Sequence, residues 1–191
     1  MLRSFRVSSE GVAAVAIWKI QEHDKAGNLI DEKEIKNLIT NSGRTQFFRN
    51  MFALAASGGF VAMAVGASTN TAQVTDTQLT YELIGNASRK PLTNINGLAL
   101  SNSDIVTGTT TIVLNATSTC TFYESMAVQA TYSTSDGNNG NQFGEYALAS
   151  TLALPGTPTA SSGVIFNHLV DPAPTVKTAA NSITAVCTIY Y

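Results

Sequence analysis

The segment from Asn37 to Ala67 constrains the fold of this chain most, because it holds the one clear helical pattern in the sequence. Apolar residues recur at helical spacing between Phe47 and Ala55 and form one wide face. The side-chain oxygen of Asn41 or Ser42 caps the first free amides, and two consecutive glycines end the helix. The pattern predicts one amphipathic helix near residues 43–56, whose apolar face a sheet must cover.

Two strands joined by a turn are expected before this helix. Residues 12–22 are rich in β-branched and aromatic side chains, residues 23–28 hold turn formers, and residues 29–39 return as a second strand. The second strand is densely charged, which protects an exposed edge against unwanted pairing. We interpret these charges as a solvated ribbon and not as catalytic groups.

The C-terminal half reads as further strands, because apolar and polar residues alternate there. Two predicted faces are Cys120, Phe122, Met126, Val128 and Ala130 in one strand, and Ile183, Ala185, Cys187 and Ile189 in another. Many short strands, a single helix and turn-rich joints predict a mainly β fold. The expected architecture is an antiparallel β-sandwich or a jelly-roll-like domain.

The length of 191 residues fits an extended N-terminal arm over residues 1–10 and a single β-rich domain over residues 11–191. The net charge of −2 gives no field for nucleic acid or membrane, so neither is an expected partner. No apolar run is long enough for a membrane helix, and no secretion signal is recognised. The chain is therefore expected to fold in the cytoplasm.

Polar character is distributed unevenly along the chain. Of the 11 Lys and Arg residues, eight lie in residues 1–50. The last hundred residues take their polarity from Ser, Thr and Asn instead. Such neutral surfaces are typical of extracellular and virion β-proteins, which meet their neighbours through uncharged hydrogen bonds.

Glu124 stands in phase with apolar residues of its predicted strand. A lone buried carboxylate is costly and needs a partner, and Arg89 and Arg44 are the candidate partners in a buried ion pair. A catalytic acid is the alternative interpretation. The ion pair is preferred because nothing else in the sequence builds a catalytic site around this residue.

The sequence contains no recognised motif for nucleophilic catalysis, phosphate binding or zinc binding. Its two histidines, His23 and His168, are not placed beside residues that would form a triad. Cys120 and Cys187 are interpreted as two buried thiols, with a cross-strand disulfide as the alternative. We therefore expect neither an enzyme, nor a cofactor, nor a metal site.

Several short segments share a pattern beyond their individual composition. They include WKIQEHDKAGN at 18–28, NLITNSG at 37–43, VTDTQL at 74–79, FYES at 122–125 and FNHLVDP at 166–172. Together they resemble small structural proteins of tailed bacteriophages, of the capsid decoration, tail or fibre type. The resemblance implies a non-enzymatic β-domain that is assembled into the virion. The chain departs from the pattern after Glu124, where a glycine is expected.

These observations predict a bacteriophage virion structural protein, a capsid decoration or cement protein that binds the particle surface as a homo-oligomer. The alternative is a tail, neck or fibre component that binds the host surface or a glycan, with Tyr123, Tyr132, Tyr146 and the 136–141 loop as contacts. Expected partners are other virion proteins, namely major capsid, tail or neck proteins. The predicted interface residues on the arm are Leu2, Arg3, Phe5 and Arg6.

Overall fold

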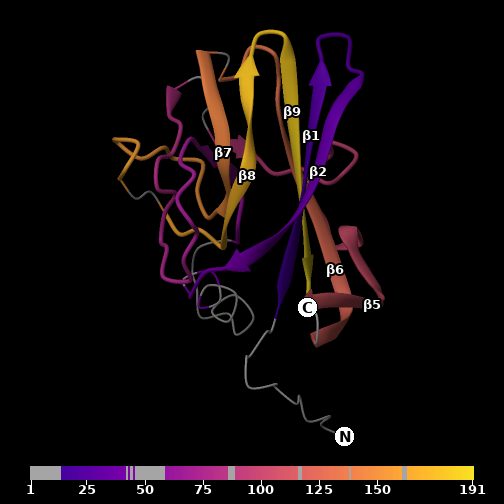
Figure 1. Ribbon diagram of the computed structural model, residues 1–191. Coiled ribbons are helices and arrows are strands. Elements are labelled where there is room, and N and C mark those ends of the chain that lie inside the picture. The colour runs from indigo at the N-terminus through magenta and orange to yellow at the C-terminus, as the bar shows by residue number, and fades with distance from the viewer. Residues whose placement is uncertain are drawn as a thin grey trace, which may run out of the picture.

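The computed structural model describes residues 14–41, 43, 45, 59–85, 89–115, 118–137, 139–160 and 163–191 (Figure 1). This part of the chain is mainly β. Its strands are β1 (Val15–Asp24), β2 (Leu29–Ile39), β3 (Ala62–Gly66), β4 (Lys90–Pro91), β5 (Ile105–Asn115), β6 (Ser118–Tyr132), β7 (Asn139–Ala149), β8 (Asn167–Thr178) and β9 (Asn181–Tyr190). A short 3-10 helix, η2 (Asn102–Asp104), precedes β5.

The strands form two antiparallel sheets that are joined to each other, in the overall order β4-β3-β7-β8-β2-β1-β9-β6-β5. The end of β2 pairs with the start of β8 through only two residue pairs, and there the first sheet continues into the second. On the opposite side, the backbones of Thr93 and Gln129 exchange two hydrogen bonds of 3.0 and 2.8 Å. The two sheets are therefore connected along both sides.

The main core lies between the two sheets, since its buried side chains come from strands of both. Trp18 of β1 packs against Tyr146 of β7 with ring centroids 5.9 Å apart. Tyr132 of β6 meets Phe143 of β7 edge to face at 5.2 Å. The predicted face of β9 is confirmed for its first three members, because Ile183, Ala185 and Cys187 are completely buried in this core.

The face predicted for the long β6 strand is wrong, because the structure divides it between two cores. Met126, Val128 and Ala130 pack with the main core, whereas Phe122 packs with Val15 and Ile112 in a separate cluster. The amides of residues 123 and 124 both donate to the carbonyl of residue 191, at 3.2 and 3.1 Å. Two residues facing one are a β-bulge, which shifts the alternation by one residue and turns the next side chains to the opposite face.

The predicted helix near residues 43–56 lies almost entirely outside the described residues. Asn41, Gly43 and Thr45 have helical backbone. A Cβ at Gly43 would lie 2.0 Å from the carbonyl oxygen of Phe166, so only glycine fits where this segment crosses the start of β8. The buried strand predicted after the helix is present as β3, which is buried along its whole length.

Candidate functional site

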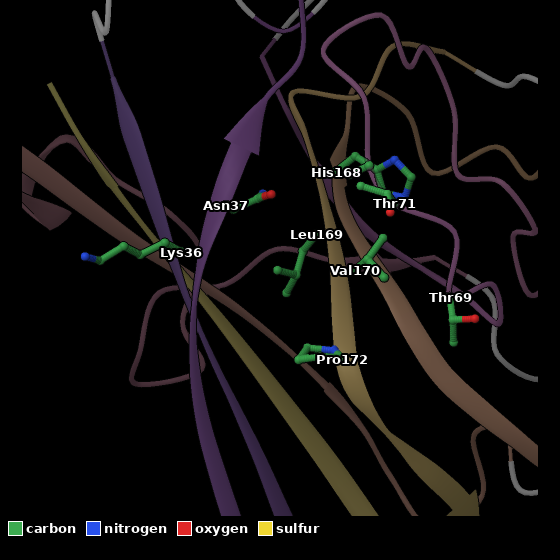
Figure 2. A pocket seen from close by; sticks show the side chains of 9 residues that line it. Lys36, Asn37, Thr69, Thr71, His168, Leu169, Val170 and Pro172 are labelled. Carbon is green, nitrogen blue, oxygen red and sulfur yellow. The ribbon is translucent and has the colours of Figure 1, made fainter. Parts of the chain in front are cut away.

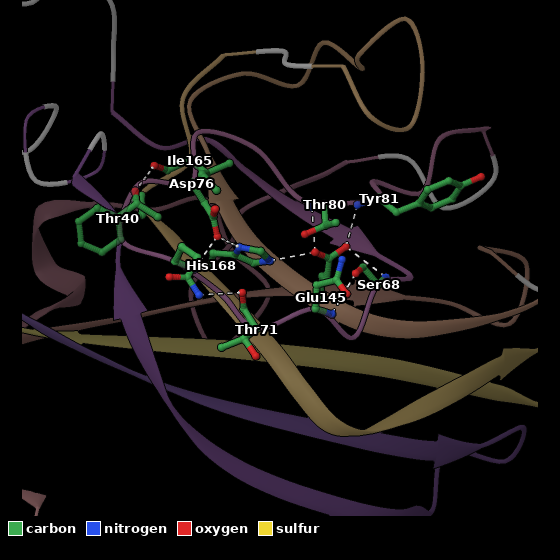
Figure 3. A network of polar contacts seen from close by, with 12 residues as sticks. Thr40, Ser68, Thr71, Asp76, Thr80, Tyr81, Glu145, Ile165 and His168 are labelled. Carbon is green, nitrogen blue, oxygen red and sulfur yellow. Dashed lines mark hydrogen bonds and ion pairs between the residues drawn. The ribbon is translucent and has the colours of Figure 1, made fainter.

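His168, the second residue of β8, is held between two carboxylates on the face of the second sheet that points away from the main core (Figure 3). Its Nδ1 lies 2.6 Å from Oδ2 of Asp76, and its Nε2 lies 2.9 Å from Oε1 of Glu145. The side chains of His168 and Glu145 are fully buried, and that of Asp76 is 26% exposed. We call Asp76, Glu145 and His168 the β8 cluster.

The Glu145 carboxylate also accepts hydrogen bonds from the loop that follows β3. The amides of Ser68, Thr80 and Tyr81 donate to its carboxylate at 3.2, 2.9 and 3.0 Å (Figure 3). A Cβ at Gly66 would lie 2.3 Å from Glu145 Oε2, so glycine is required where the loop begins. The carboxylate thus satisfies three loop amides and so fixes the loop on the sheet.

The electrostatic environment favours the charged forms of Glu145 and His168. Burial raises the pKa of Glu145, but the hydrogen bonds from His168 and the two loop amides outweigh burial and leave the pKa lowered. Burial lowers the pKa of His168, but its hydrogen bonds to Glu145 and Asp76 outweigh burial and leave the pKa raised. In its protonated form the His168 ring donates to both carboxylates, to Oδ2 of Asp76 and to Oε1 of Glu145. The arrangement fastens β7, β8 and the loop after β3 together.

Three segments that carry the phage resemblance meet at this cluster. Thr40 donates through Oγ1 to the carbonyls of Ile165 and Phe166 at 3.0 and 3.2 Å, and the amide of Asn41 donates to the carbonyl of Val74 at 2.6 Å. The segments 37–43, 74–79 and 166–172 therefore converge at the start of β8. Sequence reasoning left His168 without a role, although its partner Asp76 lies in another segment of the same pattern.

The buried ion pair of Arg89 exists, but its carboxylate belongs to Glu82 and not to Glu124. Arg89 donates from Nε and Nη2 to the two oxygens of Glu82 at 2.7 and 2.9 Å, and from Nη1 to the carbonyl of Thr151 at 3.0 Å. Both side chains of the pair are at most 3% exposed. The predicted pairing of Arg89 with Glu124 is corrected accordingly, and Arg44 lies outside the described residues.

Glu124 itself is half-buried and sits at the β6 bulge. Its backbone exchanges hydrogen bonds of 3.1 Å in both directions with Tyr191. Burial raises the pKa of the Tyr191 hydroxyl, and the neighbouring Glu124 carboxylate raises it further. The bulge explains why a carboxylate is tolerated here, because the residue lies where β6 changes faces and not inside either core.

Other buried charged residues are also partnered. Asp171 of β8 is fully buried and receives a bond of 3.2 Å from the Lys33 ammonium of β2. Lys177 donates to the carbonyls of Thr178 and Asn181 at 2.8 and 2.7 Å, and burial lowers its pKa. The first contact links the middle of β2 to β8, and the second ties the end of β8 to the start of β9.

A groove of about 380 Å³ opens where β2 and β8 separate beyond their two paired residues (Figure 2). Its lining residues are Lys36, Asn37, Thr69, Thr71, Ala72, His168, Leu169, Val170 and Pro172. The Asn37 side chain points from β2 toward β8 (Figure 2). Its Oδ1 and Nδ2 are buried and have no hydrogen-bond partner within the described part of the chain.

The outer edge of β5 is the second candidate surface. β5 ends its sheet, and no other described strand pairs with that edge. Its sequence IVTGTTTIVLN contains no charged residue, and every residue from Ile105 to Thr111 is exposed. Val106 is 62% exposed, and Tyr123 on the adjacent strand is 61% exposed. The strand lies near the C-terminus at one end of the molecule (Figure 1).

The remaining predicted site residues are placed as follows. Leu2, Arg3, Phe5 and Arg6 lie outside the described residues. Of the three tyrosines expected at a glycan-binding tip, Tyr132 and Tyr146 are fully buried in the main core, so only Tyr123 is available for contacts. Cys120 and Cys187 are free thiols, the first half-buried and the second buried, so the disulfide alternative is not realised.

Within the described residues, no group of three or more His, Cys, Asp or Glu side chains is arranged to hold a metal ion. None of the described helices is long and apolar enough to span a membrane. Comparisons of this chain with protein-family models, curated proteins and solved structures find no match.

Proposed function

We propose that this chain is a bacteriophage virion structural protein that decorates the capsid surface as a homo-oligomer and has no catalytic role. The observation that carries the proposal is the exposed, uncharged edge of β5, since an open strand edge is a template for pairing with another chain. On this proposal, the two antiparallel sheets and their shared core form a β-sandwich of the jelly-roll type. The β5 edge is the exposed edge of this sandwich.

The internal hydrogen bonds of the buried carboxylates support a structural role for this protein. The carboxylates of the β8 cluster and of Glu82 are occupied by hydrogen bonds to histidine, arginine and backbone amides. Groups engaged in this way fix loops on the sheet. A rigid protein with neutral surfaces stabilises an assembled particle by mass action, because it binds the assembled form and not free subunits.

Binding to particles tests this proposal. Purified protein is mixed with capsids of the encoding phage that lack it, and separately with host cells, and both mixtures are sedimented. The proposal predicts cosedimentation with capsids and with their major capsid protein, and none with cells. Deletion of residues 2–8 is expected to weaken capsid binding while leaving the circular dichroism spectrum unchanged. Absence of any binding to capsid, neck or tail would contradict the virion role.

A tail, neck or fibre component that binds a host glycan is the second candidate function, and the groove beside β8 favours it. The buried amide of Asn37 offers one donor and one acceptor, the pair that sugar hydroxyls complement. A glycan array compares the wild type with Asn37→Ala, with the exposed Thr157→Ala as matched control. Selective sugar binding lost only in Asn37→Ala would replace the decoration role by this one.

A further inference from the structure

We propose that two copies of this chain pair through the outer edges of their β5 strands, antiparallel, about a two-fold axis at Thr109. The inference rests on the proposed homo-oligomer and names the surface that forms it. Pairing itself requires no capsid, so it is tested on the purified protein.

The edge has the chemistry that strand pairing requires. Antiparallel strands add to each other by exchanging backbone N–H and C=O groups, and side-chain charges along an edge oppose this. The 11 residues of β5 carry no charge, and residues 105–111 are all exposed. At the far end, the Lys36 ammonium donates to the carbonyl of Val113. The carbonyl of Val113 is therefore occupied, and the available edge runs from Ile105 to Ile112.

The sequence of this edge is close to a palindrome, which selects a second copy as the partner. Residues 105–113 read I-V-T-G-T-T-T-I-V, and Thr109 is the central residue. In an antiparallel pair centred there, Thr109 opposes itself, Gly108 opposes Thr110, Thr107 opposes Thr111, and Val106 opposes Ile112. Ile105 lies opposite Val113, whose carbonyl accepts a hydrogen bond from the Lys36 ammonium and ends the ladder. A two-fold contact is self-complementary by necessity, and this register places threonine opposite threonine and branched aliphatic residues opposite each other.

The bulge in β5 is compatible with this register. The pairing of β5 with β6 shifts between Thr107 and Thr110, so the irregular residues are Gly108 and Thr109. The proposed axis passes through this point, and both strands therefore bend at the same place. A Cβ at Gly108 would meet nothing within 4 Å, so the crossing point is open. The ladder is carried by the residues on either side of the axis.

The opposite edge of the joined sheets offers no comparable surface. β4 contains only two residues, one of which is Pro91, which has no N–H to donate. Its other residue, Lys90, is held 2.6 Å from Asp136. A short edge with proline and a charge is protected against pairing. We therefore assign the self-contact to β5 alone.

Charge pairs at the axis give the sharpest test. Thr109→Lys places two ammonium groups opposite each other, and Thr109→Glu places two carboxylates there. Sedimentation velocity is expected to show a dimer for the wild type, at least tenfold weaker association for each variant alone, and a restored dimer for their equimolar mixture. Thr157→Lys, in an exposed loop, is the matched control and is expected to remain dimeric. Restoration by mixing excludes misfolding as the cause of dissociation.

A cysteine cross-link tests the register. In a Cys120→Ser background, Thr109→Cys is expected to form a disulfide-linked dimer on oxidation, whereas Thr119→Cys, exposed on β6, is not. A monomeric wild type, or a dimer that survives Thr109→Lys, would overturn the inference. A β5-paired dimer that binds no virion component would keep this inference and overturn the proposed function. A monomer that binds capsids would overturn this inference and the homo-oligomer, and would keep the capsid decoration role.

Discussion

The β8 cluster and the β5 edge use polar residues in opposite ways. At the start of β8, charged side chains are buried and each one fastens a segment distant in sequence, as His168 does with Asp76 and Glu145. Along β5, the residues are exposed and neutral, and no described strand covers the edge. On the proposed function, the buried charges fasten the fold internally, and the uncharged β5 edge makes the contact with another chain.

This contrast predicts that substitutions in the first region change stability and substitutions in the second change assembly. The largest loss is expected for Glu145→Ala, which leaves an imidazolium and three loop amides without their acceptor. Removing one partner of a buried ion pair costs about 3–5 kcal/mol of unfolding free energy. Urea denaturation of Glu145→Ala and the wild type measures this loss of unfolding free energy. Glu124→Ala, near the β5 edge, is the control and is expected to cost less than about 1 kcal/mol. Equal losses would contradict the comparison.

The Glu82–Arg89 pair sharpens the comparison, because it is buried and bidentate. Arg89→Met is expected to lower the unfolding free energy by about 3 kcal/mol, since it leaves Glu82 buried and unpaired. The double variant Glu82→Leu with Arg89→Met removes the uncompensated charge and is expected to recover most of the loss. A double-mutant cycle in urea measures the coupling between the two residues. If the losses of unfolding free energy in the two single variants simply add up in the double variant, Glu82 and Arg89 do not stabilise each other.

Stability is expected to depend on pH through the β8 cluster. Because the pKa of His168 is raised from 6.5, its contribution is complete below that value and is lost as the pH rises through the raised pKa. Because the pKa of Glu145 is lowered from 4.5, its contribution is complete above that value and is lost as the pH falls through the lowered pKa.

The unfolding free energy should therefore have a plateau between these two ordinary values and decline on both sides, by about 1.4 kcal/mol for each unit of pKa shift. Urea titrations from acid to mildly alkaline pH measure the profile. His168→Gln is expected to remove the alkaline decline and to keep the wild-type association state. An unchanged alkaline decline in that variant would locate the dependence elsewhere.

The smallest effect on stability is expected for Thr109→Lys. The residue is exposed and its side chain makes no described contact, so the unfolding free energy should change by no more than about 0.5 kcal/mol. The same variant is expected to lose self-association. Thermal unfolding of the variant at low concentration measures the first effect, and sedimentation measures the second. A loss of unfolding free energy as large as that of Glu145→Ala would show that Thr109 stabilises the fold of the single chain.

Local patterns predicted much of the strand framework. Alternation identified β9 and its buried Ile183, Ala185 and Cys187, and the charged hairpin of β1 and β2 followed from its turn residues. Alternation failed at β6, because a bulge of one residue inverts the faces and leaves no local signal. Phe122 is buried, as its apolar neighbours in the alternation predict, but it is buried in a second, smaller core.

The candidate sites depend on contacts that a linear pattern does not contain. Arg89 was expected to pair with Glu124 of β6, but its carboxylate partner is Glu82, seven positions earlier in the chain. His168 and Asp76 are separated by 92 positions. Only the folding of the loop after β3 over the second sheet brings them together, so their role follows from the tertiary structure.

The decisive experiment for β5 as the assembly edge is sedimentation velocity of Thr109→Lys and Thr109→Glu, each alone and in equimolar mixture. Both variants alone are expected to be monomeric, and their mixture is expected to sediment as a dimer, like the wild type. Variants that sediment like the wild type, or a mixture that stays monomeric, would contradict the assignment of β5 as the assembly edge.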